Sequence, residues 1–226
     1  YWRPAGEWFS SYARHELRVA RPRLAAVVSG LMRGEGLEDG AAPRVERDLL
    51  LCTHGTRDRC CAKLGGALYR ELAGRLPAAA RLWRTSHTGG HRFAPTGISF
   101  PEGLMWAGVD SRIALGVLER TLPVDLAARH LRGCAGFGGG VQQAADAAAF
   151  AQRGWIWTSY ERRATVVGDD GKTATVEVAF RNGAAGGVLR AAVERGRTLP
   201  IALCGEPIAA ARKTTTELRV VDLQQG

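Results

Sequence analysis

Short apolar runs that alternate with a helical leucine repeat, between residues 47 and 109, limit the possible folds more than any other feature of the chain. Runs of four to eight apolar residues are typical of buried strands, whereas leucines four residues apart indicate a helix. The predicted elements are, in order, a strand over 47–52, a helix over 61–76, a strand over 80–85 and a hairpin of strands over 93–100 and 104–109. This order predicts an α/β domain.

Weaker patterns flank this region. Helical spacing predicts one helix over 24–32, and Ser111 is expected to cap another that ends near residue 120. The elements expected after residue 128 are a helix over 141–153, strands over 155–167 and 173–180, a short helix over 188–195, and strands over 201–204 and 217–223. We therefore predict an α/β domain over 1–128, followed by a smaller α+β domain over 129–226.

Composition narrows the function classes. The 226 residues include 31 basic and 22 acidic side chains, for a formal net charge of +9, and only three of the basic residues are lysines. Such a charge favours an acidic partner, but the chain shows no basic helix, stacking platform or known nucleic-acid module, so we expect no nucleic-acid binding. No stretch approaches the roughly 20 apolar residues of a membrane span, so no membrane insertion is expected.

The cysteines indicate metal or redox chemistry rather than a disulfide framework. There are five, an odd number, in a chain long enough to build a core without covalent links. Cys52 and Cys61 lie within ten residues of each other, together with Cys60. Because free thiols persist in reducing compartments, we expect a cytoplasmic protein.

Four side chains with affinity for soft or borderline metals follow predicted strands. Cys52 ends one strand and Cys61 begins the next helix, where the helix dipole favours a thiolate. His87 and His91 follow the second strand, on either side of paired glycines that allow close backbone approach. The two loops could converge on one site.

Two metals suit this set, and the spacing alone does not choose between them. Two Cys and two His can hold a structural zinc ion in tetrahedral geometry. The same donors can hold a [2Fe–2S] cluster, with both thiolates on one iron and both imidazoles on the other, as in Rieske centres. The short C-x-x-C arms of zinc fingers are absent, and the longer arm here suits a larger group.

The segment Cys52-Thr-His-Gly-Thr-Arg-Asp-Arg-Cys-Cys61, followed by His87-Thr-Gly-Gly-His91-Arg-Phe-Ala, resembles the signature of the sucrase/ferredoxin-like family. Phe100-Pro-Glu-Gly103 and Trp106-Ala-Gly108 fit it as well, and the match covers roughly residues 48–110. The resemblance implies a thioredoxin-like ferredoxin fold and one [2Fe–2S] cluster with Cys52, Cys61, His87 and His91 as ligands. We expect no sucrase activity, because the sequence of this region has no pair of carboxylates that could flank a glycosidic bond.

Neighbouring residues are assigned other roles. Cys61 is preferred to Cys60 as the ligand, while Cys134 and Cys204 are expected to be structural thiols. Arg57 and Asp58 are expected to pair with each other or with the loop backbone.

We expect a redox carrier rather than an enzyme, with no catalytic residues and with an acidic protein as its redox partner. A histidine ligand has a second ring nitrogen that can hold a proton, so electron uptake can be coupled to proton uptake. The alternative is a zinc-stabilised binding module without redox activity. A thiol–disulfide oxidoreductase is disfavoured, because the chain has no C-x-x-C pair.

Overall fold

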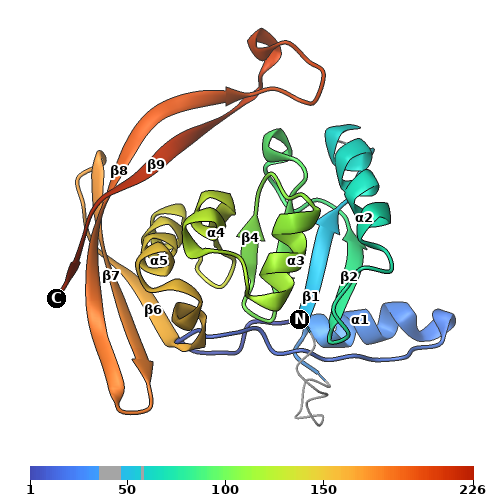
Figure 1. Cartoon of the computed structure of the whole chain (residues 1–226), viewed down its shortest axis with the longest axis horizontal. Helices are drawn as coiled ribbons and strands as arrows, with labels where there is room; N and C mark the ends of the chain where they lie inside the picture. The colour runs from blue at the N-terminus through green and yellow to red at the C-terminus, as the bar shows by residue number, and fades with distance from the viewer. Residues whose placement is uncertain (36–46, 57–58) are drawn as a thin grey trace.

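The computed structural model describes residues 1–35, 47–56 and 59–226. Arg57 and Asp58 lie outside these ranges, so their predicted pairing is not addressed. Two sheets and several helices make a mixed α/β structure (Figure 1). The helices are α1 (Leu24–Met32), α2 (Gly66–Leu72), α3 (Ser111–Glu119), α4 (Val124–His130) and α5 (Gly140–Arg153). The strands are β1 (Arg47–Cys52), β2 (Ala80–Thr85), β3 (Gly97–Phe100), β4 (Leu104–Trp106), β5 (Leu131–Cys134), β6 (Glu161–Asp169), β7 (Thr173–Asn182), β8 (Ala185–Ile201) and β9 (Lys213–Gln225).

The first sheet has the strand order β2-β1-β3-β4-β5. β1 and β2 run parallel, and each remaining neighbouring pair is antiparallel. The strands predicted over 47–52 and 80–85 are confirmed, as is the hairpin, although its strands are shorter than predicted. The strand at the far edge, β5, begins at Leu131, so this sheet continues beyond residue 128, where the sequence indicated a domain boundary.

The second sheet is antiparallel throughout, in the order β6-β7-β8-β9. This sheet curves around α5 (Figure 1). The sequence predicted this helix over 141–153. The short helix predicted over 188–195 is wrong, because this stretch lies inside β8. Leu189, Ala191 and Val193 are buried at alternate positions, which is the period of a strand with one face on the core.

Other boundaries also differ from the prediction. The helix expected over 61–76 begins with a π-helical turn, Cys61–Gly65, and α2 ends at Leu72. The N-cap of α3 is Asp110 rather than Ser111, since an oxygen of Asp110 accepts a hydrogen bond from the backbone N–H of Ile113 at 2.7 Å. The first residues of the strand predicted over 155–167 form a 3₁₀ turn, Gly154–Ser159, and the strand itself, β6, begins at Glu161. Of the strand predicted over 201–204, only Ile201 is in a strand.

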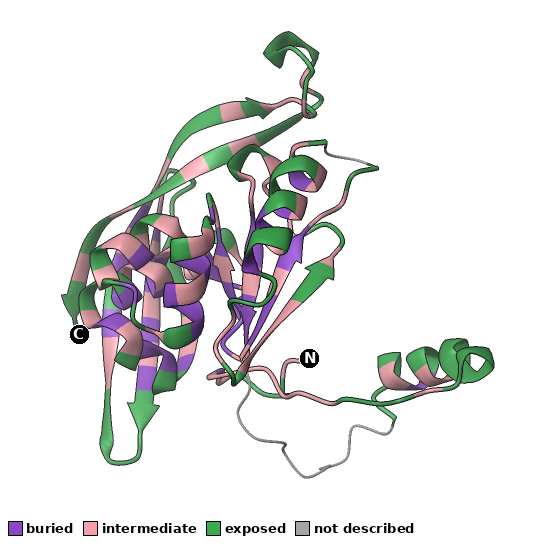
Figure 2. Cartoon of the chain, turned by 45° about the vertical axis from the view of Figure 1, so that its right-hand side comes forward, coloured by how far each residue is buried: buried purple, intermediate pink, exposed green. Residues whose placement is uncertain are grey.

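One hydrophobic core runs through both sheets (Figure 2). Trp106 on β4 and Trp157, just before β6, are both fully buried in it. The N-terminal segment contributes Phe9, which exchanges two backbone hydrogen bonds of 2.8 Å with Arg162 on β6. No helix among the described residues is long and apolar enough to cross a membrane.

Candidate functional site

The strand register brings the predicted ligand loops to one edge of the first sheet. Cys52 at the end of β1 pairs with Thr85 at the end of the parallel strand β2. The backbone N–H of Cys52 also bonds the carbonyl of Thr96, just before β3, at 2.9 Å. The segments that carry Cys61, His87 and His91 therefore leave or approach the sheet at the same edge.

A glycine allows the helix start to pack directly on the end of β1. A Cβ atom added to Gly65 would lie 2.1 Å from the carbonyl oxygen of Cys52, much closer than real Cβ contacts. Because the clashing atom is backbone, a larger residue would push the π turn away from the strand. Gly65 thus keeps Cys61, at the start of that turn, close to the end of β1.

The four predicted ligands differ in their access to solvent. The side chains of Cys52 and Cys61 are each only 1% exposed. His91 is half-buried, and His87 is exposed. The thiols therefore lie inside this edge of the sheet, and the imidazoles lie toward the solvent.

The four side chains do not form a ready-made metal site. Within residues 1–35, 47–56 and 59–226, no three His, Cys, Asp or Glu side chains are grouped closely enough to hold a metal ion. The Nε2 atom of His91 instead lies 2.9 Å from the carbonyl oxygen of Ala202. The donor chemistry and the shared sheet edge fit a metal group, but metal binding would require these side chains to turn toward one another.

Cys60 points to a different set of neighbours. Its thiol donates a hydrogen bond to the backbone carbonyl of His91 at 3.5 Å. Burial raises the pKa of Cys60, and a hydrogen bond with the thiol of Cys204 raises it further. Cys204 was expected to be a buried structural thiol. It is half-buried instead, and it lies near Cys60.

Arg132 is a site residue that sequence reasoning did not identify. From β5, its guanidinium donates a hydrogen bond to the carbonyl of Gly89 at 3.1 Å and lies over the ring of Phe93. Burial lowers the pKa of Arg132, and the nearby charge of Arg92 lowers it further. Arginine remains charged at neutral pH, so two cationic groups lie beside the histidine loop. Nothing in the local pattern around Arg132 signals this contact, which depends on the pairing of β5 with β4.

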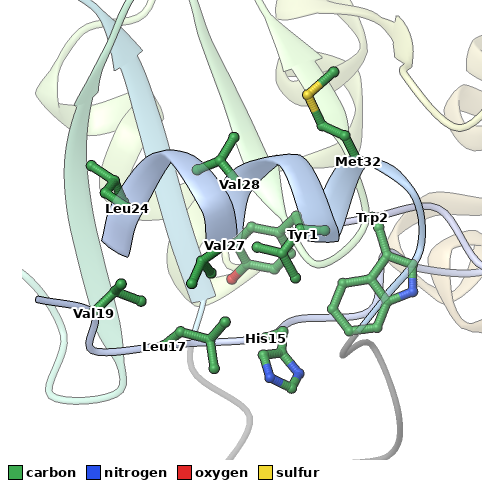
Figure 3. A pocket seen from close by; sticks show the side chains of 10 residues that line it. Tyr1, Trp2, His15, Leu17, Val19, Leu24, Val27, Val28 and Met32 are labelled. Atoms are coloured by element: carbon green, nitrogen blue, oxygen red, sulfur yellow. The ribbon is translucent and has the colours of Figure 1, made fainter. Parts of the chain in front are cut away.

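Two pockets lie at different places on the molecule. One, of about 450 Å³, lies between the His91 region and the connection from β8 to β9, and Cys60, His91, Arg92 and Cys204 are among its lining residues. The other, of about 400 Å³, lies beside α1 and is lined mainly by apolar side chains, with Tyr1 behind the helix in the view of Figure 3. Unlike the pocket beside α1, the first pocket is lined by residues of the predicted ligand region.

Comparison with known proteins gives one match. The family model described as sucrase/ferredoxin-like matches residues 4–133, which is more than half of the chain and includes all four predicted ligands. Neither the curated proteins nor the solved structures gave a match.

Proposed function

Since the chain belongs to the sucrase/ferredoxin-like family, we propose that it is an electron-transfer protein that binds one [2Fe–2S] cluster. The proposed ligands are Cys52, Cys61, His87 and His91. The observation that carries this proposal is their placement: two buried thiols and two more accessible imidazoles come from loops at one edge of one sheet.

The donor chemistry supports the cluster. Thiolates are the usual ligands of iron–sulfur clusters, and imidazoles replace two of them in centres of higher reduction potential. When bound, the cluster would supply one-electron redox chemistry. The buried positions of Cys52 and Cys61 would exclude water from one side, while His87 would face solvent, where its second ring nitrogen could exchange a proton.

The surrounding charges favour an anionic group. Arg92 and Arg132 place two guanidinium groups around the loop that carries both histidines. Positive charges at short range stabilise a negatively charged centre, and they do so more strongly where water is partly excluded. To reach a shared group, the imidazole of His91 would leave the carbonyl of Ala202, and the backbone between His87 and His91 has two glycines that permit such a change.

The topology supports a thioredoxin-like domain. A parallel pair, β1 and β2, is joined through a helix and followed by the antiparallel hairpin of β3 and β4, with α3 after it. We propose that this unit is the ferredoxin domain and that the second sheet and α5 form a smaller unit on it. Cysteines that do not form disulfides are compatible with a reducing cytoplasm, and the charge of +9 favours an acidic redox partner.

An anaerobic redox titration tests the proposed function. Addition of dithionite should bleach the visible absorption of the purified chain after the uptake of one electron per chain, and reoxidation should restore it. A chain that holds zinc on the same four donors has no such absorption and takes up no electrons. That result would overturn electron transfer and support a zinc-stabilised binding module instead.

A further inference from the structure

The connection between β8 and β9 reaches back to the first sheet. In Figure 1 these strands form a long hairpin whose tip extends past the second sheet toward α2. At this tip, residues 202–212, the carbonyl oxygen of Ala202 lies 2.9 Å from the Nε2 atom of His91. The pocket of about 450 Å³ between the tip and the His91 region brings Cys204 from the tip and Cys60 from the ligand loop to one surface.

Both thiols line this pocket. Cys60 and Cys204 are both free, and both are half-buried rather than sealed in the core. Cys204 is also among the groups that raise the pKa of the Cys60 thiol, so the two side chains are close enough to influence each other. Gly205, which follows Cys204, has φ +89°, and Gly205 and Glu206 are both exposed, so the tip can adjust without disturbing the core.

We propose that Cys60 and Cys204 form a redox-active dithiol pair that a low-molecular-weight disulfide oxidises to an intramolecular disulfide. The pair is separate from the proposed cluster ligands. The proposal requires only that Cys60 is not itself a ligand.

The reaction is a double thiol–disulfide exchange. The sulfur of Cys204, after loss of its proton, attacks the oxidant disulfide, and one thiol of the oxidant leaves as a mixed disulfide forms. The deprotonated sulfur of Cys60 then attacks the Cys204 sulfur of that mixed disulfide and releases the second thiol. The protein loses two protons and two electrons, and the oxidant takes them up to become two thiols.

Oxidation would anchor the tip over the ligand loop. In the reduced protein the contacts that hold the tip there include the hydrogen bond between His91 and the backbone carbonyl of Ala202, which can break reversibly. A covalent bond would prevent the tip from leaving and would keep Ala202 beside His91. The redox state of the pair would therefore control access to the histidine side of the site.

The test is disulfide mapping of the purified, folded full-length chain after incubation with glutathione disulfide, followed by alkylation of remaining thiols. The expected product is a link between tryptic peptides 60–63 and 198–212, reversed by dithiothreitol. Peptide 60–63 contains Cys60 and Cys61, so variants must distinguish them. The link should disappear in Cys60→Ser and Cys204→Ser and persist in Cys134→Ser, the matched control whose thiol is buried elsewhere.

Two results would overturn the dithiol pair. One is a link to peptide 198–212 that persists in Cys60→Ser, which would assign it to Cys61. The other is no link in the wild-type chain while both thiols remain open to alkylation. Iron content measured on the same samples separates this outcome from the proposed function, since loss of the disulfide with iron retained leaves the cluster proposal standing.

Discussion

Asp48 shows how a single buried carboxylate can make stability depend on pH. Its side chain is 1% exposed, and Arg81 donates two hydrogen bonds to it, at 2.8 and 2.9 Å. Tyr1 and Trp83 donate as well. Burial alone would raise the pKa of Asp48, but these hydrogen bonds outweigh it and hold the pKa below its usual value.

This lowered pKa predicts a loss of stability in acid. A carboxylate with a folded-state pKa below its unfolded value of about 3.9 stabilises the fold above that pH and loses the contribution as pH falls through the folded pKa. Asp48→Asn should therefore flatten the fall in unfolding free energy between about pH 5 and pH 2. Urea unfolding across this range measures it. Asp125→Asn, at an exposed ion pair with Arg129, is the control, and an equal flattening there would contradict the assignment.

The individual cysteines can be separated by substitution. Cys52→Ser and Cys61→Ser should lose the cluster, because serine replaces a thiolate ligand of iron with a poorer oxygen donor. Cys60→Ser, Cys134→Ser and Cys204→Ser should retain it. Iron and acid-labile sulfide per chain, measured after anaerobic purification, provide the comparison. Retention in Cys61→Ser with loss in Cys60→Ser would show that the ligand assignment is wrong by one residue.

At the scale of elements, the contact between the π turn and β1 positions the proposed site. Gly65→Ala should disrupt it, since the new Cβ would lie 2.1 Å from a backbone oxygen of Cys52, and overpacking of this kind typically costs about 1–3 kcal/mol. The adjacent Gly66→Ala is the matched control. The nearest atom to its Cβ is the end of the Arg70 side chain at 3.7 Å, and alanine favours a helix by up to about 1 kcal/mol.

Thermal unfolding and iron content of both variants check this prediction. Gly65→Ala should unfold at a lower temperature and hold less iron, whereas Gly66→Ala should match or exceed the wild type in both. Equal unfolding temperatures and equal iron contents in the two variants would show that neither stability nor iron binding depends on the close approach of Gly65 to β1.

The success of sequence reasoning differed among elements for physical reasons. The run that became β1 contains four consecutive apolar residues, 49–52, so its burial was predictable. The middle of β8 was not, because Ala191 and Ala192 favour a helix and the strand depends on pairing with β7 and β9. The four proposed ligands were predicted from their local spacing and from the family resemblance, and they stay a prediction. The partners Arg132, Ala202 and Cys204 were not predicted, since distant strand pairings bring them to the site.

At the scale of the whole molecule, one continuous hydrophobic core contains residues from both predicted domains, 1–128 and 129–226. β5 completes the first sheet, and α5 follows it directly and packs on the second. A buried ion pair of Asp146 on α5 with Arg162 on β6, at 2.9 Å, lies in the same core. Phe9 joins this core from the N-terminal segment. The second sheet and its hairpin tip are thus structurally linked to the proposed redox site.

A [2Fe–2S] cluster held by the two cysteines, Cys52 and Cys61, and the two histidines, His87 and His91, has a defined metal content, sulfide content and colour, which metal and sulfide analysis and a visible spectrum measure together. Protein produced with ample iron and purified without oxygen should be red-brown and contain two irons and two inorganic sulfides per chain, the content of a single [2Fe–2S] cluster. A colourless protein with stoichiometric zinc under the same conditions would show that the four residues hold zinc and no cluster.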